Sequence, residues 1–283
     1  MQPILKWAGG KRKIRKEILH CFPKDYAIRN YHEPFFGAGS LFFEIKPNKG
    51  SINDINSKLI KFYEIVKNKP EELIEQTLNY KYEKDEFYKL RDRFNKKGLL
   101  DLEYASLLLY FNKTAYNGLY RENSKGEFNV PFGDYTNPTI VSKKRIMEVS
   151  RVLQNITIFN KDFEYIEKYA KKGDICYFDP PYEPLSKTSH FTSYSKDNFN
   201  LDDQIRLRDT CLKLHEKEVW FVLSNSDLEK IKDMYNEKKI FQINKIKSIG
   251  MISGKTASRG PINHILVTNV PKNIQDRGLE SFV

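Results

Sequence analysis

The spacing of hydrophobic and polar positions changes twice along this chain and divides it into three regions. Residues 1 to about 56 contain short apolar runs separated by Gly and Pro, residues 57 to about 111 follow helical spacing, and short apolar runs return from about residue 151. Short apolar runs favour buried strands, whereas sustained spacing of three and four residues favours helices. The pattern therefore predicts a split α/β domain that is interrupted by a mainly helical insert.

The predicted strands lie in the first and third regions. One short run ends at Glu33, and a second ends near Asn53 and Asp54. Three later apolar runs are typical of strands buried on both faces: Ile156–Phe159, Ile175–Phe178 and Val219–Leu223. Ile240–Ile246 and Ile262–Val267 are expected to form a final antiparallel pair.

The insert carries signals for helices and for one hairpin. Pro70 suits a first helical turn, and Leu73, Ile74 and Leu78 are expected on one buried face. Ser124–Gly126 predicts a hairpin tip, because Gly readily adopts positive φ between two short arms.

Length and composition fit a folded globular protein. With 283 residues, 40% of them hydrophobic and 13% aromatic, the chain is long enough for about two structural units. The expected segments are an α/β domain in two parts, an inserted domain and a polar tail, at residues 1–56 with 151–270, 57–150, and 271–283.

Composition also argues against several classes of protein. No run approaches the ~20 apolar residues of a membrane span, and no apolar leader with a cleavage site follows the N-terminus. The cysteines, Cys21, Cys176 and Cys211, are odd in number and widely spaced, which favours a reduced, cytoplasmic protein without disulfides. Because neither they nor the five histidines show ligand spacing, we expect no metal site.

The positive charge is concentrated in two segments. Lysine and arginine exceed the acids by 48 − 37 = 11, and residues 6–16 and 238–260 each hold six basic residues and no acid. Chance clustering in a lysine-rich chain is one interpretation. The other is a surface that binds a polyanion such as nucleic acid.

The sharpest chemical signal is Asp179-Pro180-Pro181-Tyr182, directly after the predicted strand Ile175–Phe178. Ligands of open α/β sheets bind outside the carboxyl ends of the strands. Asp179 and the Pro180 carbonyl offer two acceptors for the two N–H donors of an exocyclic amino group, and Tyr182 offers a ring for stacking. A base in a duplex would first have to be flipped out. A rigid turn after a core strand is the alternative interpretation.

Two weaker signals precede this tetrapeptide. Phe35-Phe36-Gly37-Ala38-Gly39 would let the backbone approach a ligand closely, and Asp54, 17 residues after Gly37, suits ribose hydroxyls. Lys6-Trp7-Ala8-Gly9-Gly10-Lys11 offers two glycines, a ring and an ammonium group but lacks the spacing of a phosphate-binding loop. Either motif alone is also typical of an ordinary turn.

Together these motifs resemble the DNA adenine-N6 methyltransferases of the Dam-like (D12) class, group alpha. The resemblance runs from about residue 4 to 269, and the matching segments are Lys6–Lys11, Glu33–Ser40, Asn117–Arg121, Gly126–Gly133, Asp179–Tyr182, Pro184–Ser186 and Phe191–Tyr194. It implies a Rossmann-like methyltransferase sheet, with residues 1–56 and 151–270 as the catalytic domain. The helical insert at 57–150, with its β-hairpin, would be the target-recognition domain.

The resemblance implies S-adenosylmethionine as the cofactor. Trp7 and Lys11 would lie near its methionine end, Asp54 on its ribose and Asp162 on its adenine. The implied cofactor-binding residues are Trp7, Ala8, Gly9, Lys11, Phe36, Gly37, Gly39, Asp54, Asp162 and Asp179.

The resemblance also implies double-stranded DNA as the substrate, with a flipped adenine held by Asp179, Pro180 and Tyr182 for methylation at N6. Members that read GATC carry counterparts of six residues here: Lys6, Tyr116, Asn117, Leu119, Arg121 and Pro131. An arginine suits a guanine edge, apolar side chains suit a thymine methyl, and a tyrosine can fill the gap left by a flipped base. We therefore expect GATC as the recognition site. Relatives often carry an acid in place of His264, which is a departure in this chain.

Two alternatives stay open. A methyltransferase acting on RNA or on a protein amide uses a related tetrapeptide, although that one usually begins with Asn. A catalytically silent DNA-binding module would need only the basic segments. DNA binding implies a location on the nucleoid in the cytoplasm. The sequence leaves open both the oligomeric state and the choice between restriction-modification and a stand-alone role.

Overall fold

The computed structural model describes residues 1–7, 9–11, 13–182, 199–236, 240–248 and 262–276, which form two compact units. The helical unit comprises Met1–Gly10, Gly37–Lys46 and Asp54–Asn160, and the sheet unit comprises Lys11–Phe36, Pro47–Asn53 and Lys161–Val283. Several predicted features lie outside the described residues, namely Ala8, Pro184–Ser186, Phe191–Tyr194 and most of the segments 238–260 and 271–283.

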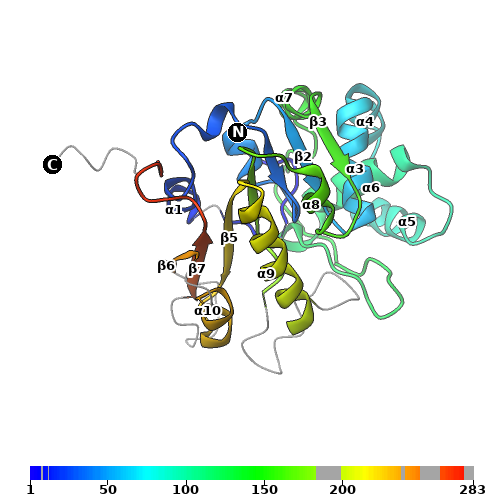
Figure 1. Cartoon of the computed structure of the whole chain (residues 1–283). Helices are drawn as coiled ribbons and strands as arrows, with labels where there is room; N and C mark the ends of the chain where they lie inside the picture. Colours follow the sequence, from blue (N-terminus) through cyan, green and yellow to red (C-terminus); the bar gives the residue numbers. More distant parts are fainter. Residues whose placement is uncertain (8, 12, 183–198, 237–239, 249–261, 277–283) are drawn as a thin grey trace. The chain divides into compact units, whose positions relative to one another are not determined.

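The strands form a seven-stranded sheet in the order β3-β2-β1-β4-β5-β7-β6 (Figure 1). Their bounds are β1 Tyr31–Glu33, β2 Gly50–Asn53, β3 Ile156–Phe159, β4 Ile175–Phe178, β5 Trp220–Ser226, β6 Gln242–Ser248 and β7 Ile262–Thr268. β1 pairs in parallel with β2 and β4, and β4 pairs in parallel with β5. β7 pairs antiparallel with both β5 and β6. The predicted α/β fold, mostly parallel with a final antiparallel pair, is confirmed.

β5 is longer than its apolar run predicts, because it continues past Leu223 to Ser226. Ser224 and Asn225 are fully buried and stay in register with β7. Their side chains find polar partners, as Asn225 Nδ2 donates to Gln204 Oε1 at 2.9 Å. A strand predicted from apolar residues alone is therefore too short when the strand continues through buried polar side chains that have hydrogen-bond partners.

The sheet unit is completed by helices that cover its apolar surface. They are α1 Arg15–His20, η1 Tyr26–Ile28, α8 Tyr165–Tyr169, α9 Leu201–Glu216 and α10 Glu229–Asn236. α9 begins with a capping box between Asn200 and Asp203 and packs Leu207, Cys211 and Leu214 into the core of the sheet unit.

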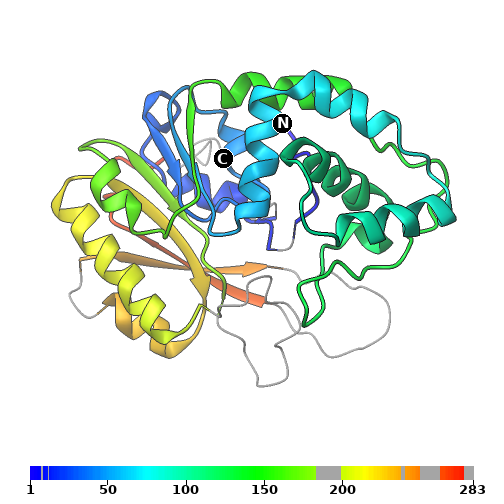
Figure 2. The same ribbon diagram turned by 90° about the vertical axis from the view of Figure 1, so that its right-hand side faces the viewer.

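The helical unit contains the predicted insert. Its helices are α2 Phe42–Ile45, α3 Ser57–Asn68, α4 Pro70–Leu78, α5 Lys84–Phe94, α6 Asp101–Thr114, η2 Tyr116–Gly118 and α7 Lys143–Leu153 (Figure 2). Pro70 starts α4 as expected, and Leu73 and Ile74 are buried, but Leu78 is 52% exposed. Five residues turn a helix by ~140° beyond a full turn, so Leu78 cannot share the face of Leu73. No helix in the described parts of the chain is long and apolar enough to cross a membrane.

The boundaries of the helical unit differ from the expected domain ends at 56/57 and 150/151. Residues 1–10, 37–46, 54–56 and 151–160 group with the insert. Contacts across these positions explain the grouping: Lys67 Nζ donates to the Ile156 carbonyl at 2.7 Å, and Asn160 Nδ2 donates to the Asp54 carbonyl at 2.7 Å. The division into a catalytic and a target-recognition domain stays a prediction.

The chain turns at the predicted hairpin tip within the helical unit. Asn123 N donates to the Glu127 carbonyl at 2.8 Å, and Glu122 and Phe128 form an antiparallel bridge. Gly126 has a φ of +77°, the left-handed conformation that the turn requires. The two arms are also bridged farther from the tip, between Ala115 and Phe132.

A buried polar chain joins the amino ends of three strands in the sheet unit. His32 of β1 lies 2.9 Å from Ser51 Oγ through Nδ1 and 3.0 Å from Asp174 Oδ2 through Nε2. Asn30 Nδ2 and Lys171 N also donate to Asp174, at 2.8 and 2.9 Å. Burial alone would raise the pKa of Asp174, but these hydrogen bonds outweigh burial and hold it below its ordinary value.

Replacing Asp174 by Ala is expected to lower the free energy of unfolding by about 1.5–3 kcal/mol at neutral pH, because buried donors lose an ionised acceptor. Since the folded-state pKa is depressed, this contribution is present above the unfolded pKa of about 4 and is lost as the pH falls through the lowered value. Urea unfolding of both proteins at neutral pH and at about pH 3 measures the effect. A difference that does not shrink with acid would contradict this role.

Candidate active site

The loop Asp179–Tyr182 leaves the sheet unit at a central strand. β4 is buried along its whole length and lies between β1 and β5, with which it pairs in parallel. Asp179 follows β4 directly, at the carboxyl edge of the sheet where such folds bind ligands. Pro180 is buried, whereas Asp179 and Tyr182 are half-buried. The loop therefore has both access to the surface and a rigid base.

Asp179 is held through one of its two carboxylate oxygens. Lys11 Nζ lies 2.7 Å from Oδ1, and Ser224 Oγ donates to the same atom at 2.9 Å. Burial alone would lower the pKa of Lys11, but attraction to Asp179 and Tyr182 outweighs it and raises that pKa above its ordinary value. Within the described part of the chain, neither Asp179 Oδ2 nor the Pro180 carbonyl accepts a hydrogen bond. Among the described residues, these two oxygens are thus acceptors of the loop that have no donor.

The ring of Tyr182 lies between a cation and an imidazole. Lys11 Nζ is 4.4 Å from its centroid, and the centroid of His264 is 5.6 Å away. Burial raises the pKa of Tyr182 to about 12, so the phenol is neutral at physiological pH. Burial and the nearby Lys11 lower the pKa of His264. The carboxylate that Lys11 binds in the structure is that of Asp179, and its expected place near the methionine end of the cofactor stays a prediction.

In the helical unit, Asp54 is bonded to the predicted glycine turn. Gly37 N donates to Asp54 Oδ2 and Asn56 N to Oδ1, both at 2.9 Å. Gly37 and Gly39 have φ values of +51° and +68°, which favour glycine. Burial raises the pKa of Asp54 above its ordinary value despite the two hydrogen bonds. Each oxygen keeps a second lone pair for a ligand donor.

Trp7 also contacts this turn within the helical unit. Its ring stacks on Tyr120 at a centroid distance of 5.6 Å, and a Cβ at Gly37 would lie 3.4 Å from Trp7 Cδ1. Gly9 is exposed, with open space where a side chain would lie. Phe36 belongs to the sheet unit, and its ring is only 2% exposed. The ring of Phe36 is therefore part of the core, and its backbone N donates to the Asn53 carbonyl at 2.9 Å.

An asparagine that the sequence did not single out fixes Lys6 in the helical unit. Lys6 N donates to Asn112 Oδ1 at 2.8 Å, and Asn112 Nδ2 donates back to the Lys6 carbonyl at 2.7 Å. A Cβ at Gly118 would lie 2.5 Å from Lys6 Cδ and 2.9 Å from the Asn112 carbonyl oxygen. Only glycine therefore lets the loop after α6 approach Lys6 so closely.

The residues predicted to read DNA all have exposed side chains: Lys6, Tyr116, Asn117, Leu119, Arg121 and Pro131. Tyr116 and Leu119 are 54% and 42% exposed. Tyr116 N donates to the Pro131 carbonyl at 2.9 Å, and Arg121 Nε donates to Asn129 Oδ1 at 2.8 Å. The helical unit thus presents apolar and cationic groups on connected loops.

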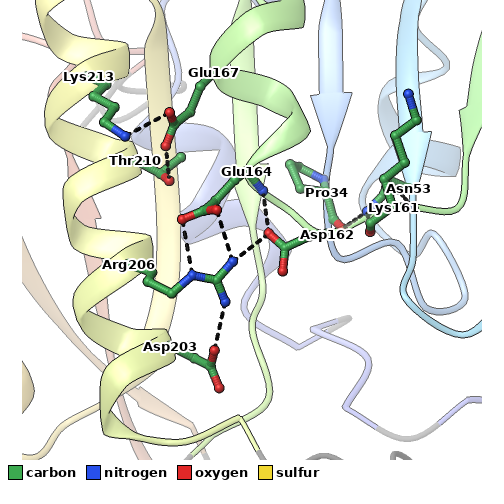
Figure 3. A network of polar contacts seen from close by, with 10 residues as sticks. All are labelled: Pro34, Asn53, Lys161, Asp162, Glu164, Glu167, Asp203, Arg206, Thr210 and Lys213. Atoms are coloured by element: carbon green, nitrogen blue, oxygen red, sulfur yellow. Dashed lines mark hydrogen bonds and ion pairs between the residues drawn. The ribbon is translucent and has the colours of Figure 1, made fainter.

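Asp162 belongs to a network in the sheet unit that the sequence did not reveal (Figure 3). Arg206 of α9 contacts Asp162, Glu164 and Asp203. The asparagine at the end of β2, Asn53, donates to the Lys161 carbonyl and accepts from Lys161 N, at 3.0 and 2.8 Å. Asp162 is therefore fixed from both its backbone and its side chain.

Ser224, Asn112 and Arg206 are the supporting residues that sequence reasoning missed. A polar run, Ser224–Ser226, directly after an apolar strand was the one available signal, because such positions lie at the carboxyl edge of the sheet. Asn112 is 106 residues from Lys6, and Arg206 lies on another element from Asp162, so neither pairing leaves a local pattern.

Comparison with known proteins agrees with this arrangement of motifs. Residues 7–249 match the family described as D12 class N6 adenine-specific DNA methyltransferase. The chain is 44% identical to the Type II methyltransferase M1.LlaDCHI of Lactococcus lactis subsp. cremoris, over 95% of both chains. It is 39% identical to the Type II methyltransferase M.MjaIII of Methanocaldococcus jannaschii, over 95% of this chain and 99% of that one. It is 32% identical to the DNA adenine methylase of Escherichia coli K12, over 95% of both. The chain therefore belongs to the D12 class of N6 adenine-specific DNA methyltransferases.

Proposed function

We propose that this enzyme transfers the methyl group of S-adenosylmethionine to adenine N6 within GATC in duplex DNA, after flipping the adenine out of the helix. The observation that carries the proposal is the asymmetric binding of Asp179, whose Oδ1 is held by Lys11 and Ser224. Its Oδ2 and the Pro180 carbonyl supply the two acceptors that an exocyclic amino group requires. Family membership favours DNA adenine over the RNA and protein-amide substrates that the tetrapeptide alone allowed.

Asp179 and Pro180 act on the amino group through position and charge. Two acceptors that bind both N–H groups orient the nitrogen so that its lone pair is available for attack. Lys11 fixes Asp179 Oδ1 by an ion pair at 2.7 Å, which sets the direction of the second oxygen. S-adenosylmethionine, when bound, supplies an electrophilic methyl group on sulfur. Tyr182 is the aromatic surface for the flipped base, and an adenine stacked there would compete with Lys11 or His264 for the ring.

The contacts of the predicted cofactor residues fit the nucleoside part of the donor. Asp54 holds the Gly37 turn by its amide and keeps lone pairs for ribose hydroxyls. Gly9 is exposed, with no atom within 4 Å of the place where a side chain would lie, and Trp7 lies against Gly37. These contacts support roles for Trp7, Gly9, Gly37, Gly39 and Asp54 in binding the donor.

Replacing Asp54 by Ala is expected to weaken binding of S-adenosylhomocysteine by at least about tenfold, because the ribose loses an acceptor and Gly37 N loses its partner. Asp54→Asn separates the two effects, since its carbonyl oxygen can still accept from Gly37 N. Isothermal titration calorimetry measures both variants. Wild-type affinity in Asp54→Ala would remove Asp54 from the cofactor site.

Plasmid digestion tests the recognition site directly. DNA treated with the enzyme and S-adenosylmethionine should resist a nuclease that methylated GATC blocks and should be cut by one that requires methylated GATC. DNA that is methylated yet stays sensitive to the first nuclease would contradict GATC. A duplex with 2-aminopurine at the target position should gain fluorescence on binding, and an unchanged signal would contradict base flipping.

A further inference from the structure

Arg206 binds three carboxylates of the sheet unit at once (Figure 3). Its Nη2 lies 2.9 Å from Asp162 Oδ1 and 3.0 Å from Glu164 Oε2. Its Nε donates to Glu164 Oε1 at 3.1 Å, and its Nη1 donates to Asp203 Oδ1 at 2.9 Å. The guanidinium also lies 4.9 Å from the centroid of the Phe163 ring. This planar group therefore has its orientation fixed by four neighbouring side chains.

The two oxygens of Asp162 are not equivalent. Oδ1 receives Arg206 Nη2 and a hydrogen bond from Glu164 N at 2.9 Å. Oδ2 makes no hydrogen bond or ion pair with any residue that the structure describes. Figure 3 shows this oxygen pointing away from the guanidinium. Asp162 thus presents one fixed, unused acceptor.

The charges around Asp162 explain why a cation is needed there. Asp162, Glu164 and Asp203 carry three negative charges, and Arg206 is the cation that contacts all three. The hydrogen bonds that Arg206 donates to Glu164 and Asp162 raise the pKa of its guanidinium, so it stays protonated. Without Arg206, repulsion from Glu164 would drive Asp162 to another rotamer.

We propose that Arg206 is a positioning residue for recognition of the donor's adenine: by holding Asp162 Oδ1, it aims Oδ2 at the exocyclic amino group. The inference rests on the proposed role of Asp162 in binding the cofactor. Arg206 of α9 is thereby added to the residues that act on cofactor binding. Asp162 Oδ1 is paired with Arg206, and Oδ2 is paired with the 6-amino group. The 6-amino group is then recognised by a hydrogen bond that depends on Arg206, although Arg206 does not touch the ligand.

The test compares two ligands that differ in one group. Calorimetry measures the affinity of the full-length enzyme for S-adenosylhomocysteine and for the analogue in which hydrogen replaces the 6-amino group. The wild-type enzyme should prefer the amino ligand by about tenfold or more, as a hydrogen bond to an ionised acceptor provides. Arg206→Ala should lower this preference to about threefold or less, while affinity for the hydrogen analogue changes by less than about twofold.

Two further variants control for folding and for docking of α9. Lys213 of the same helix pairs with Glu167 of α8 at 2.8 Å and does not contact Asp162, so Lys213→Ala should keep the full preference. Arg206→Lys keeps a charge on the helix but cannot bridge Asp162 and Glu164 through a planar fork, so its preference should be intermediate. Asp162→Ala should abolish the preference, and adding Arg206→Ala to it should change nothing further.

The outcomes separate the inference from the proposed function. Wild-type enzyme that does not bind S-adenosylhomocysteine would contradict both. Wild-type enzyme that binds it, with the preference intact in Asp162→Ala, would contradict the role of Asp162 and with it that of Arg206. If Asp162→Ala loses the preference but Arg206→Ala keeps it, or weakens both ligands equally, only the inference is overturned.

Discussion

Asp179→Ala is expected to reduce the rate of methyl transfer by about 10³-fold or more, because the amino group loses an acceptor that both orients it and stabilises developing positive charge. DNA affinity should stay within a small factor, since the predicted recognition residues are on loops of the helical unit. The variant also leaves Lys11 without its carboxylate at 2.7 Å. A lower free energy of unfolding is therefore expected as well.

Asp179→Asn is the matched variant. Asn keeps an acceptor oxygen and the shape of the side chain but removes the charge, so transfer should fall less than in Asp179→Ala. Incorporation of labelled methyl groups into DNA gives the rate, and thermal unfolding with DNA binding shows that each variant is folded. Turnover by Asp179→Ala within tenfold of wild type would show that this carboxylate is not the group that orients the adenine.

Arg121→Ala is expected to reduce discrimination at one guanine position by about 1–3 kcal/mol, equivalent to roughly 5- to 150-fold in relative kcat/KM. Arg121 Nε is bound to Asn129 Oδ1 at 2.8 Å, whereas its Nη groups make no hydrogen bond or ion pair among the described residues. The side chain is thus oriented by its neighbour, with a free fork that fits the O6 and N7 atoms of guanine.

The measurement is kcat/KM on duplexes in which each base pair of GATC is changed in turn. Lys245→Gln is the control, because Lys245 is an exposed lysine of the basic segment 238–260. Lys245→Gln should weaken binding to all sequences alike. It should also reduce the slope of log affinity against log salt concentration by about one. Equal losses at every base pair for Arg121→Ala would identify it as a phosphate contact rather than a reader of sequence.

The fold could be predicted largely from apolar patterns. β4 has the predicted bounds because a strand that is buried along its whole length consists of a continuous apolar run. β3 also has the predicted bounds, but its expected burial was wrong, because it is an edge strand in which only Ile156 is buried. β5 was predicted too short because Ser224 and Asn225 are buried with polar partners that lie far away in the chain. The face assigned to Leu78 was wrong for a geometric reason, since its spacing from Leu73 departs from the helical period.

The candidate site was predicted less completely than the fold. Motif residues such as Asp179 and Asp54 are visible because their types and positions after strands carry chemical meaning. Their supporting residues are not visible, because Ser224, Asn112 and Arg206 acquire their roles through contacts between distant segments. Those contacts decide which oxygen of each carboxylate a ligand can use.

Methyl transfer to adenine N6 within GATC is tested most directly by locating the transferred methyl group on DNA. The enzyme is incubated with S-adenosylmethionine labelled in the methyl group and with a duplex that contains one GATC and several other adenines, and mass spectrometry then identifies the modified nucleosides and their positions. The proposed reaction should give N6-methyladenine at the GATC adenine of each strand, and none with Asp179→Ala. Label on cytosine, on adenines outside GATC, or at undiminished levels with Asp179→Ala would contradict it.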